Sequence, residues 1–239
     1  MNDLKLEHID IYKELVGVSS EEVQQLIKNE NFFRCEDVDY QGKQAISAVI
    51  DEIVGFGVAE IENELSHKEF PGLESWIGLA PEQLQTPYDE LLDLTHELDL
   101  CGQESVVDLG AGYGRLGLVL SQQKPDVSFT GYELVGERVE RGNQVFNQLA
   151  VDNAKLIEQN IIDQDFEIKD SDVYFIYDFG QKEHINQVLK RLDHLANESD
   201  FKIVARGRGV RSLIHHKYPR FCRAIEPKHF DTYSVYSTP

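Results

Sequence analysis

The sequence predicts an α/β protein in which a mostly parallel sheet is covered by helices on both faces, with a helical region in front of it. Two observations carry this prediction. After about residue 104, short apolar segments alternate with segments of helical spacing, a pattern that is typical of repeated β–α units. Within that pattern, 106–114 reads as a buried strand that ends in an acidic residue and enters a glycine-rich turn.

The first hundred residues show helical spacing instead. Ser19 or Ser20 can cap a helix over 21–28. A longer helix is predicted from about residue 43 to residue 65, and two glycines inside it predict a kink or a break. The stretch 69–81 contains two prolines and two glycines and is predicted to be a loop or linker.

From residue 86 the predicted elements follow one another closely. Thr86 reads as an N-cap, with Pro87 at the first helical position of a helix that ends near Leu98. The segments that follow are predicted as strands over 105–109, 127–133, 154–159, 172–177 and 201–206, and as helices over 116–122, 136–150 and 183–195.

Composition limits the class of protein. No apolar run approaches the roughly 18 to 20 residues that cross a bilayer, and the N-terminus lacks a signal-peptide pattern, so we expect a cytoplasmic protein without a membrane partner. Cys35, Cys101 and Cys222 are widely spaced, which predicts reduced thiols, with neither a disulfide framework nor a bound metal. The pair His215 and His216 is expected at the surface.

The charge of the chain is −20 and is unevenly distributed. Acidic residues dominate up to residue 200, whereas residues 201–239 contain eight Lys and Arg against two Asp and Glu. Because binding to phosphates needs a broad basic face, the acidic body argues against a nucleic-acid partner. The basic segment 202–228 either meets an anionic substrate or pairs with the acidic part of the chain. The run 206–211 within it follows the predicted strand 201–206 and either lies over the ligand crevice at the strand ends or is a flexible, solvated loop, which is the commoner outcome for such runs.

The glycine-rich turn predicts a ligand site. Glycines let the backbone approach a ligand, and the helix that follows offers free N–H groups. A dinucleotide would place a pyrophosphate on this turn, and Asp108, two residues before Gly110, would repel it. S-adenosylmethionine brings an ammonium and a sulfonium group, which an acid can hold. Gly112, Gly114 and Gly117 also spell the dinucleotide pattern G-x-G-x-x-G, so an NAD-dependent oxidoreductase remains an alternative.

The pattern Asp108-x-Gly110-x-Gly112-x-Gly114 resembles motif I of the class I, Rossmann-like, S-adenosylmethionine-dependent methyltransferases. The likeness covers about residues 84 to 239. Within the class, the segment 84–94 followed by motif I is more weakly similar to the non-SET protein-lysine methyltransferases.

The resemblance implies a domain organisation and a sheet. Residues 1–83 would form a helical N-terminal region, and residues 84–239 would form the S-adenosylmethionine-binding methyltransferase domain. Its seven-stranded, mostly parallel sheet would end in an antiparallel edge hairpin made of 221–225 and 233–237. The helical region could cover the acceptor pocket or form a dimer.

Candidate cofactor-binding residues lie at strand ends, where open parallel sheets bind ligands. Glu133 ends the second strand, and a carboxylate there can accept both ribose hydroxyls. The resemblance implies that Asn160 meets the adenine amino group and Ile161 packs on the ring, although a plain loop turn is the alternative. It also implies that the element around Thr86 closes over the methionine end. The predicted cofactor-binding residues are Thr86, Asp108, Gly110, Ala111, Gly112, Gly114, Glu133, Asn160 and Ile161.

Candidate catalytic residues follow the fourth strand. Tyr177, Asp178 and Phe179 occupy the position that faces the methyl group in the resembling enzymes, but the two prolines of the Asn/Asp-Pro-Pro-Tyr element are missing. This absence argues against adenine, cytosine and glutamine as acceptors. Asp178 could hold an incoming ammonium and help to remove its proton, or it could cap a helix or pair with Lys182. The predicted catalytic residues are Asp178 with Tyr177 or Tyr88.

The sequence therefore predicts an S-adenosylmethionine-dependent methyltransferase whose acceptor is an amine on a protein or a small molecule. Two other classes remain as alternatives. One is a catalytically silent S-adenosylmethionine-binding module whose helical region recruits a partner. The other is the NAD-dependent oxidoreductase.

Overall fold

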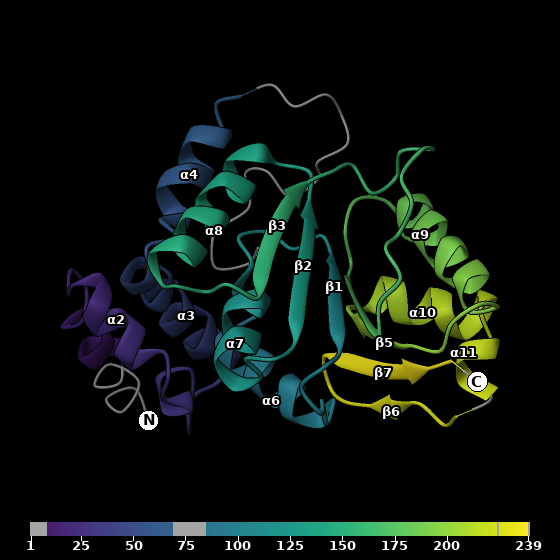
Figure 1. The fold of residues 1–239 in the computed structure, drawn as a ribbon, viewed down its shortest axis with the longest axis horizontal. Helices are drawn as coiled ribbons and strands as arrows, with labels where there is room; N and C mark the ends of the chain where they lie inside the picture. Colours follow the sequence, from purple (N-terminus) through teal and green to yellow (C-terminus); the bar gives the residue numbers. More distant parts are fainter. Residues whose placement is uncertain (1–8, 69–84, 224, 239) are drawn as a thin grey trace.

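The computed structural model describes residues 9–68, 85–223 and 225–238. Figure 1 shows one twisted sheet with helices on both sides of it. The seven strands are ordered β3-β2-β1-β4-β5-β7-β6, and β7 runs antiparallel to both of its neighbours. The strands are β1 (Ser105–Leu109), β2 (Ser128–Glu133), β3 (Ala154–Glu158), β4 (Val173–Tyr177), β5 (Lys202–Arg206), β6 (Lys228–His229) and β7 (Tyr233–Ser237).

The helices of the described residues form two groups around this sheet. Those on one side are α2 (Ser20–Leu26), α3 (Tyr40–Val54), α4 (Val58–Leu65), α6 (Tyr88–Glu97), α7 (Arg115–Gln123) and α8 (Gly136–Gln148). Those on the other side are α9 (Lys182–Leu195), α10 (Arg208–Lys217) and α11 (Arg220–Arg223). A short 3₁₀ helix, Glu30–Phe32, connects α2 to α3.

Successive residues of the strands face opposite helix layers. Val106 packs in the hydrophobic cluster that contains α3, α4, α6, α7 and α8, whereas Val107 packs in the cluster that contains α9 and α10. The same alternation separates Phe175 from Ile176 on β4. Because both faces of the central strands are covered, these strands read as continuous apolar runs, and the predicted α/β class is confirmed.

The helical region matches its predicted elements closely. Ser19 caps α2, and its hydroxyl and the Glu22 carboxylate form a reciprocal capping box. The long predicted helix is broken into α3 and α4, because Gly55 (φ +95°) ends α3 in the left-handed conformation and Gly57 (φ +55°) precedes α4. The predicted loop over 69–81 lies outside the described residues.

The predicted cap of α6 is wrong. The helix begins at Tyr88 with Pro87 as its N-cap residue, and no side chain of that residue caps it. Instead, the Tyr88 backbone amide donates to the Ser47 hydroxyl of α3 at 3.1 Å. A helix distant in sequence therefore satisfies the first amide group, which the local Thr-Pro pattern cannot reveal.

Two predictions near the C-terminus are also wrong. The run 206–211 is not a loop, because α10 begins at Arg208. The segment predicted as a strand over 221–225 contains the end of α11, where Phe221 is fully buried in the cluster with α9 and α10. The antiparallel edge is present, but its outer strand is the shorter β6.

The helical region and the sheet share one hydrophobic core. Ile50 of α3 and Phe56, which follows it, belong to the same buried cluster as Leu118 of α7 and Phe146 of α8. The predicted boundary between residues 83 and 84 stays a prediction, but the helices before it are packed into the core of the fold. Among the described residues, no helix is both long and apolar enough to cross a bilayer.

Candidate functional site

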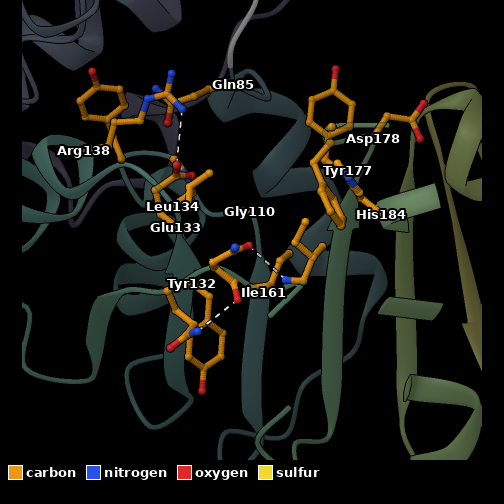
Figure 2. A pocket seen from close by; sticks show the side chains of 17 residues that line it. Gln85, Gly110, Tyr132, Glu133, Leu134, Arg138, Ile161, Tyr177, Asp178 and His184 are labelled. Carbon is orange, nitrogen blue, oxygen red and sulfur yellow. Dashed lines mark hydrogen bonds and ion pairs between the residues drawn. The ribbon is translucent and has the colours of Figure 1, made fainter. Parts of the chain in front are cut away.

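Two cavities lie side by side at the carboxyl ends of β1, β2 and β4. The first cavity encloses about 100 Å³, and Figure 2 shows the side chains that line it. The second cavity encloses about 60 Å³ and reaches from the glycine-rich turn to α6 and β5. Both cavities are lined by Gln85, Gly110, Gly112 and Tyr177, which mark the place where they meet.

The glycine-rich turn is held against β2 by its own backbone. The amides of Gly110 and Ala111 both donate to the Tyr132 carbonyl, at 2.9 and 3.0 Å. Gly114 has φ +87°, and a Cβ there would lie 2.8 Å from the Phe146 ring, so this position needs glycine. The turn therefore presents a bare backbone between the cavities. Gly110 and Gly112 line both of them, and Ala111 lines the second, whereas Gly114 has a structural role.

Asp108 lines the second cavity behind this turn. Desolvation, with added repulsion from Glu133, raises the pKa of the Asp108 carboxyl to about 7. A cation bound beside the carboxyl would favour the ionised form, so the site is suited to a positively charged ligand group.

Glu133 ends β2 and lines the first cavity, as the sequence predicts. Its side chain is buried, and its two oxygens accept hydrogen bonds from the amides of Gly112 (2.9 Å) and Val135 (3.0 Å). The Arg138 guanidinium lies 3.4 Å from the same carboxylate. Oε1 accepts from both Val135 and Arg138, whereas Oε2 accepts from Gly112 alone and keeps a lone pair for a ligand hydroxyl.

Asn160 and Ile161 also line the first cavity. The Asn160 side chain forms a local turn, in which its carbonyl oxygen accepts from the Ile162 amide at 3.2 Å and its amide donates to Asp163 at 2.6 Å. Asn160 therefore forms the loop turn that was the alternative interpretation, and it also lies beside the cavity. Thr86 lines the second cavity, where its backbone carbonyl accepts from Arg115 at 3.0 Å.

The structure gives Asp178 a capping role. It lines the first cavity at the edge seen in Figure 2, but its two oxygens accept hydrogen bonds from the amides of Gly209 (2.8 Å) and Val210 (2.6 Å). These amides belong to the first turn of α10, so the cap serves α10 rather than the helix that follows Asp178 in sequence. Gly207 permits the close approach, because a Cβ there would lie 2.4 Å from the carboxylate.

The two tyrosines predicted as catalytic have different positions. Tyr177 lines both cavities, and the Arg206 guanidinium lies 4.7 Å from the centre of its ring. Tyr88 lines neither cavity. It is fully buried, and its hydroxyl donates to Asp51 at 2.9 Å. The prediction that Tyr88 acts on the acceptor is therefore corrected, because that side chain supports the packing of α6 on α3.

Three arginines line the cavities, and sequence reasoning singled out only the run that begins with Arg206. Arg138 lines the first cavity, and Arg115 and Arg206 line the second. All three are buried. The position of Arg115 directly after Gly114 could have indicated its role, but nothing local indicates that of Arg138.

Each of these arginines is held by a residue of the helical region. Asp51 of α3 accepts from the Nε (2.9 Å) and an Nη atom of Arg115. Glu62 of α4 accepts from Arg138 at 2.8 and 3.0 Å. Arg206 donates to the Tyr40 hydroxyl of α3 at 3.0 Å and to Glu90 of α6 at 2.7 Å.

Two buried N–H donors have no partner among the described residues. They are the Nε2 of Gln85 and the Nε of Arg206, and both side chains are more than nine-tenths buried. Both line the second cavity, which also contains Asp108. Buried donors are normally paired, so this cavity is built to receive a group that accepts hydrogen bonds.

Part of the chain is similar to known methyltransferases. Residues 102–174 match a family described as "Putative methyltransferase". Two curated relatives, both tRNA (guanine-N(7)-)-methyltransferases from Synechococcus strains, are 38% identical over 60 residues. Those residues are 25% of this chain and 25% of each relative, so the chain matches about a quarter of the length of these relatives.

Two solved methyltransferase structures are similar to this chain, and the first of them supports the same fold. A precorrin-6y C5,15-methyltransferase from Geobacter metallireducens is 14% identical, with a TM-score of 0.50 over 71% of this chain and 97% of that one. An RNA methyltransferase from Salinibacter ruber, in complex with S-adenosyl-L-homocysteine, is 17% identical with a TM-score of 0.48, over 64% and 92% of the two chains.

The Rossmann-like fold expected of a class I methyltransferase is confirmed, and the family match over residues 102–174 supports that class. S-adenosyl-L-methionine is the cofactor of this class, and the residues around the two cavities fit it: a carboxylate and bare glycine backbone at one end, and Glu133 with Asn160 and Ile161 at the other.

The prediction against a nucleic-acid partner is wrong, because the curated relatives are tRNA methyltransferases. The error came from using the charge of the whole chain, whereas a nucleic acid meets only one face. The basic residues of the last 39 positions include exposed side chains on and beside α10 and α11, namely Arg208, Lys217, Arg223 and Lys228.

Proposed function

We propose that this protein transfers a methyl group from S-adenosylmethionine to a ring nitrogen of a nucleic-acid base, with guanine N7 in tRNA as the first acceptor to test. The observation that carries the choice of acceptor is the engagement of Asp178. Both of its oxygens accept from backbone amides of α10, which fixes the carboxylate as the cap of that helix and favours an acceptor that needs no base.

The chemistry of the acceptor follows from this geometry. An alkylamine is protonated at neutral pH and must lose a proton before it can attack, which calls for a nearby base. Guanine N7 carries a lone pair and no proton. Its methylation therefore needs alignment and exclusion of water more than proton transfer.

The cofactor would occupy both cavities. Glu133 would accept from the ribose hydroxyls, and Asn160 with Ile161 would hold the adenine in the first cavity. Asp108 and the glycine-rich turn would hold the amino-acid end in the second cavity. The bound cofactor supplies an electrophilic methyl group on its sulfonium. That group would lie where the cavities meet, beside Tyr177.

Side chains on the acceptor side are suited to a nucleotide. Tyr177 and Phe179 line the first cavity, and aromatic rings are common stacking partners of unpaired bases. Arg208 lies at the start of α10 next to the segment that Asp178 caps, and its side chain is exposed. Exposed cations at this edge would attract phosphates despite the negative charge of the whole chain.

A methyl-transfer assay tests the proposal. The purified protein is incubated with S-adenosylmethionine carrying a labelled methyl group and with tRNA, protein or small-molecule fractions of a cell extract. We expect label in the tRNA fraction, recovered as 7-methylguanosine after digestion to nucleosides. Label in protein or small molecules would instead support the amine acceptor and refute the nucleic-acid proposal. Cofactor binding without S-adenosylhomocysteine formation in any fraction would favour the silent binding module.

A further inference from the structure

Within the described parts of the chain, the lining of the second cavity combines one carboxyl group with two unpaired hydrogen-bond donors. Asp108 lies on its β1 side, Gln85 precedes α6, and Arg206 ends β5. The free donors are the Nε2 of Gln85 and the Nε of Arg206, each on a side chain that is more than nine-tenths buried. Leaving a buried donor unpaired costs free energy, so a ligand that pairs with both would be favoured here.

Not every buried donor in the second cavity is free, as Arg115 shows. It lines the same cavity, but its Nε and both Nη groups already donate to Asp51 and to the Thr86 carbonyl. Arg206 uses its Nη2 for Tyr40 and Glu90, and its Nε is left over. The second cavity therefore has one guanidinium whose three nitrogens all donate to protein groups and one whose Nε is available to a ligand.

We infer that Gln85 and Arg206 bind the α-carboxylate of the cofactor, while Asp108 binds its α-amino group. An α-amino acid carries an ammonium group and a carboxylate on the same carbon. The acid in this cavity suits the ammonium group, and the two N–H donors suit the carboxylate. Neither Gln85 nor Arg206 lies in the glycine-rich motif, and the two residues are far apart in the sequence although they line the same cavity. The inference rests on the proposed function, because it takes S-adenosylmethionine as the ligand.

The inference predicts a preference between two ligands that differ in one group. Decarboxylated S-adenosylmethionine keeps the adenosine, the sulfonium and the amine, and lacks only the carboxylate. Hydrogen bonds to a charged group contribute about 1.5–3 kcal/mol, which corresponds to about a 10- to 100-fold difference in Kd. We expect the wild-type protein to bind S-adenosylmethionine more tightly than the decarboxylated ligand by this factor.

Two variants test which residues make the difference. Gln85→Leu removes the unpaired amide, and Arg206→Lys keeps a positive charge for Glu90 while it removes the Nε–H group. Both should weaken S-adenosylmethionine binding in calorimetric titrations and leave binding of the decarboxylated ligand within about twofold. Gln85→Leu also removes a buried unpaired donor, so the melting temperature of the free protein should not fall.

Matched controls are Gln144→Leu on the exposed face of α8 and Arg220→Lys on α11, which line neither cavity. These controls should keep the wild-type preference. Equal affinity of the wild-type protein for the two ligands would overturn the inference and leave the proposed function intact, as would an equal loss for both ligands in the variants. Failure of the wild-type protein to bind S-adenosylmethionine at all would instead refute the proposed function.

Discussion

The two regions of this protein contribute to the site in different ways. The sheet provides the residues that line the cavities, because Asp108, Glu133 and Tyr177 each lie at or near the end of a strand. The described helices of the first 68 residues line neither cavity. Yet Tyr40, Asp51 and Glu62 in those helices hold the three arginines that do.

This difference assigns a role to the helical region. Arg115 and Arg138 are buried cations, and a cation in the protein interior is stable only when it is paired. The helices that carry Asp51 and Glu62 thus make it possible to place guanidinium groups beside the ligand cavities. The described part of this region supports the site from behind and shares the core of the sheet, so its removal should disturb both stability and cofactor binding.

The largest effect is expected when a carboxylate of the helical region that holds one of these arginines is removed. Asp51→Ala leaves Arg115 buried without its carboxylate partner, which should destabilise the protein by about 3–5 kcal/mol. The measurement is the free energy of unfolding in urea. Asp10→Ala is the matched control, because Asp10 pairs with Lys13 at an exposed site and such pairs contribute less than about 1 kcal/mol. Similar values for the two variants would show that the helical region does not stabilise the site.

The next largest effect is expected from a substitution in the sheet. Asp108 is the only carboxylate that lines the second cavity among the residues that the structure describes, and Asp108→Ala removes it. S-adenosylmethionine should then bind too weakly to detect by calorimetry at micromolar protein concentrations. The protein should still fold, since the substitution removes a poorly solvated acid. Unchanged affinity in this variant would refute the assignment of the second cavity to the cofactor.

The raised pKa of Asp108 predicts a pH dependence of binding. Only the ionised carboxyl attracts an ammonium group, so affinity for S-adenosylmethionine should rise as the pH increases through about 7. Between pH 5.5 and 7 the gain should be about tenfold, and Asp108→Asn should abolish the dependence. The measurement is a set of titrations across this range, kept below the pKa of the ligand's own amino group.

The stability of the free protein should change in the opposite direction. The folded chain binds the Asp108 proton more tightly than the unfolded chain, where the pKa is near 3.8. This group therefore favours the folded state most below pH 4, and its contribution is lost as the pH rises through about 7. Thermal unfolding of the wild-type protein and of Asp108→Asn between pH 4 and 8 separates this contribution from that of other groups.

Most of the core was predictable because its signals are local. The apolar run of β1, the adjacent glycines and the acid that ends β2 all lie within a few residues of the structures they specify. The break between α3 and α4 was readable for the same reason, since glycine at Gly55 permits the left-handed conformation that ends a helix.

The missed features depend on distant partners. Arg115 and Asp51 are 64 residues apart in sequence, and Arg138 and Glu62 are 76 apart, so no local pattern connects them. The cap of α6 by Ser47 and the pairing of Asp178 with α10 are likewise tertiary contacts. Such contacts decide whether a polar residue near a strand end is free to react or is already occupied.

The smallest expected effect concerns Asp178, and it tests whether the hydrogen bonds to α10 leave this carboxylate without a part in the reaction. Asp178→Asn keeps an oxygen that can accept from one amide of α10, but it loses the negative charge at the start of that helix. The cost should be about 1 kcal/mol in the free energy of unfolding. If the acceptor is a ring nitrogen without a proton, methyl transfer to tRNA should fall by no more than the loss of folded protein explains.

A base in the mechanism would give the opposite result. Were Asp178 to remove a proton from an amine, the asparagine variant would remain stable and bind the cofactor, yet turnover would drop by about 100-fold or more. Glu183→Gln, which removes an acid from the first turn of α9, controls for the change of charge. Comparing turnover with unfolding free energy in these two variants distinguishes a helix cap from a catalytic carboxylate at the same position of the fold.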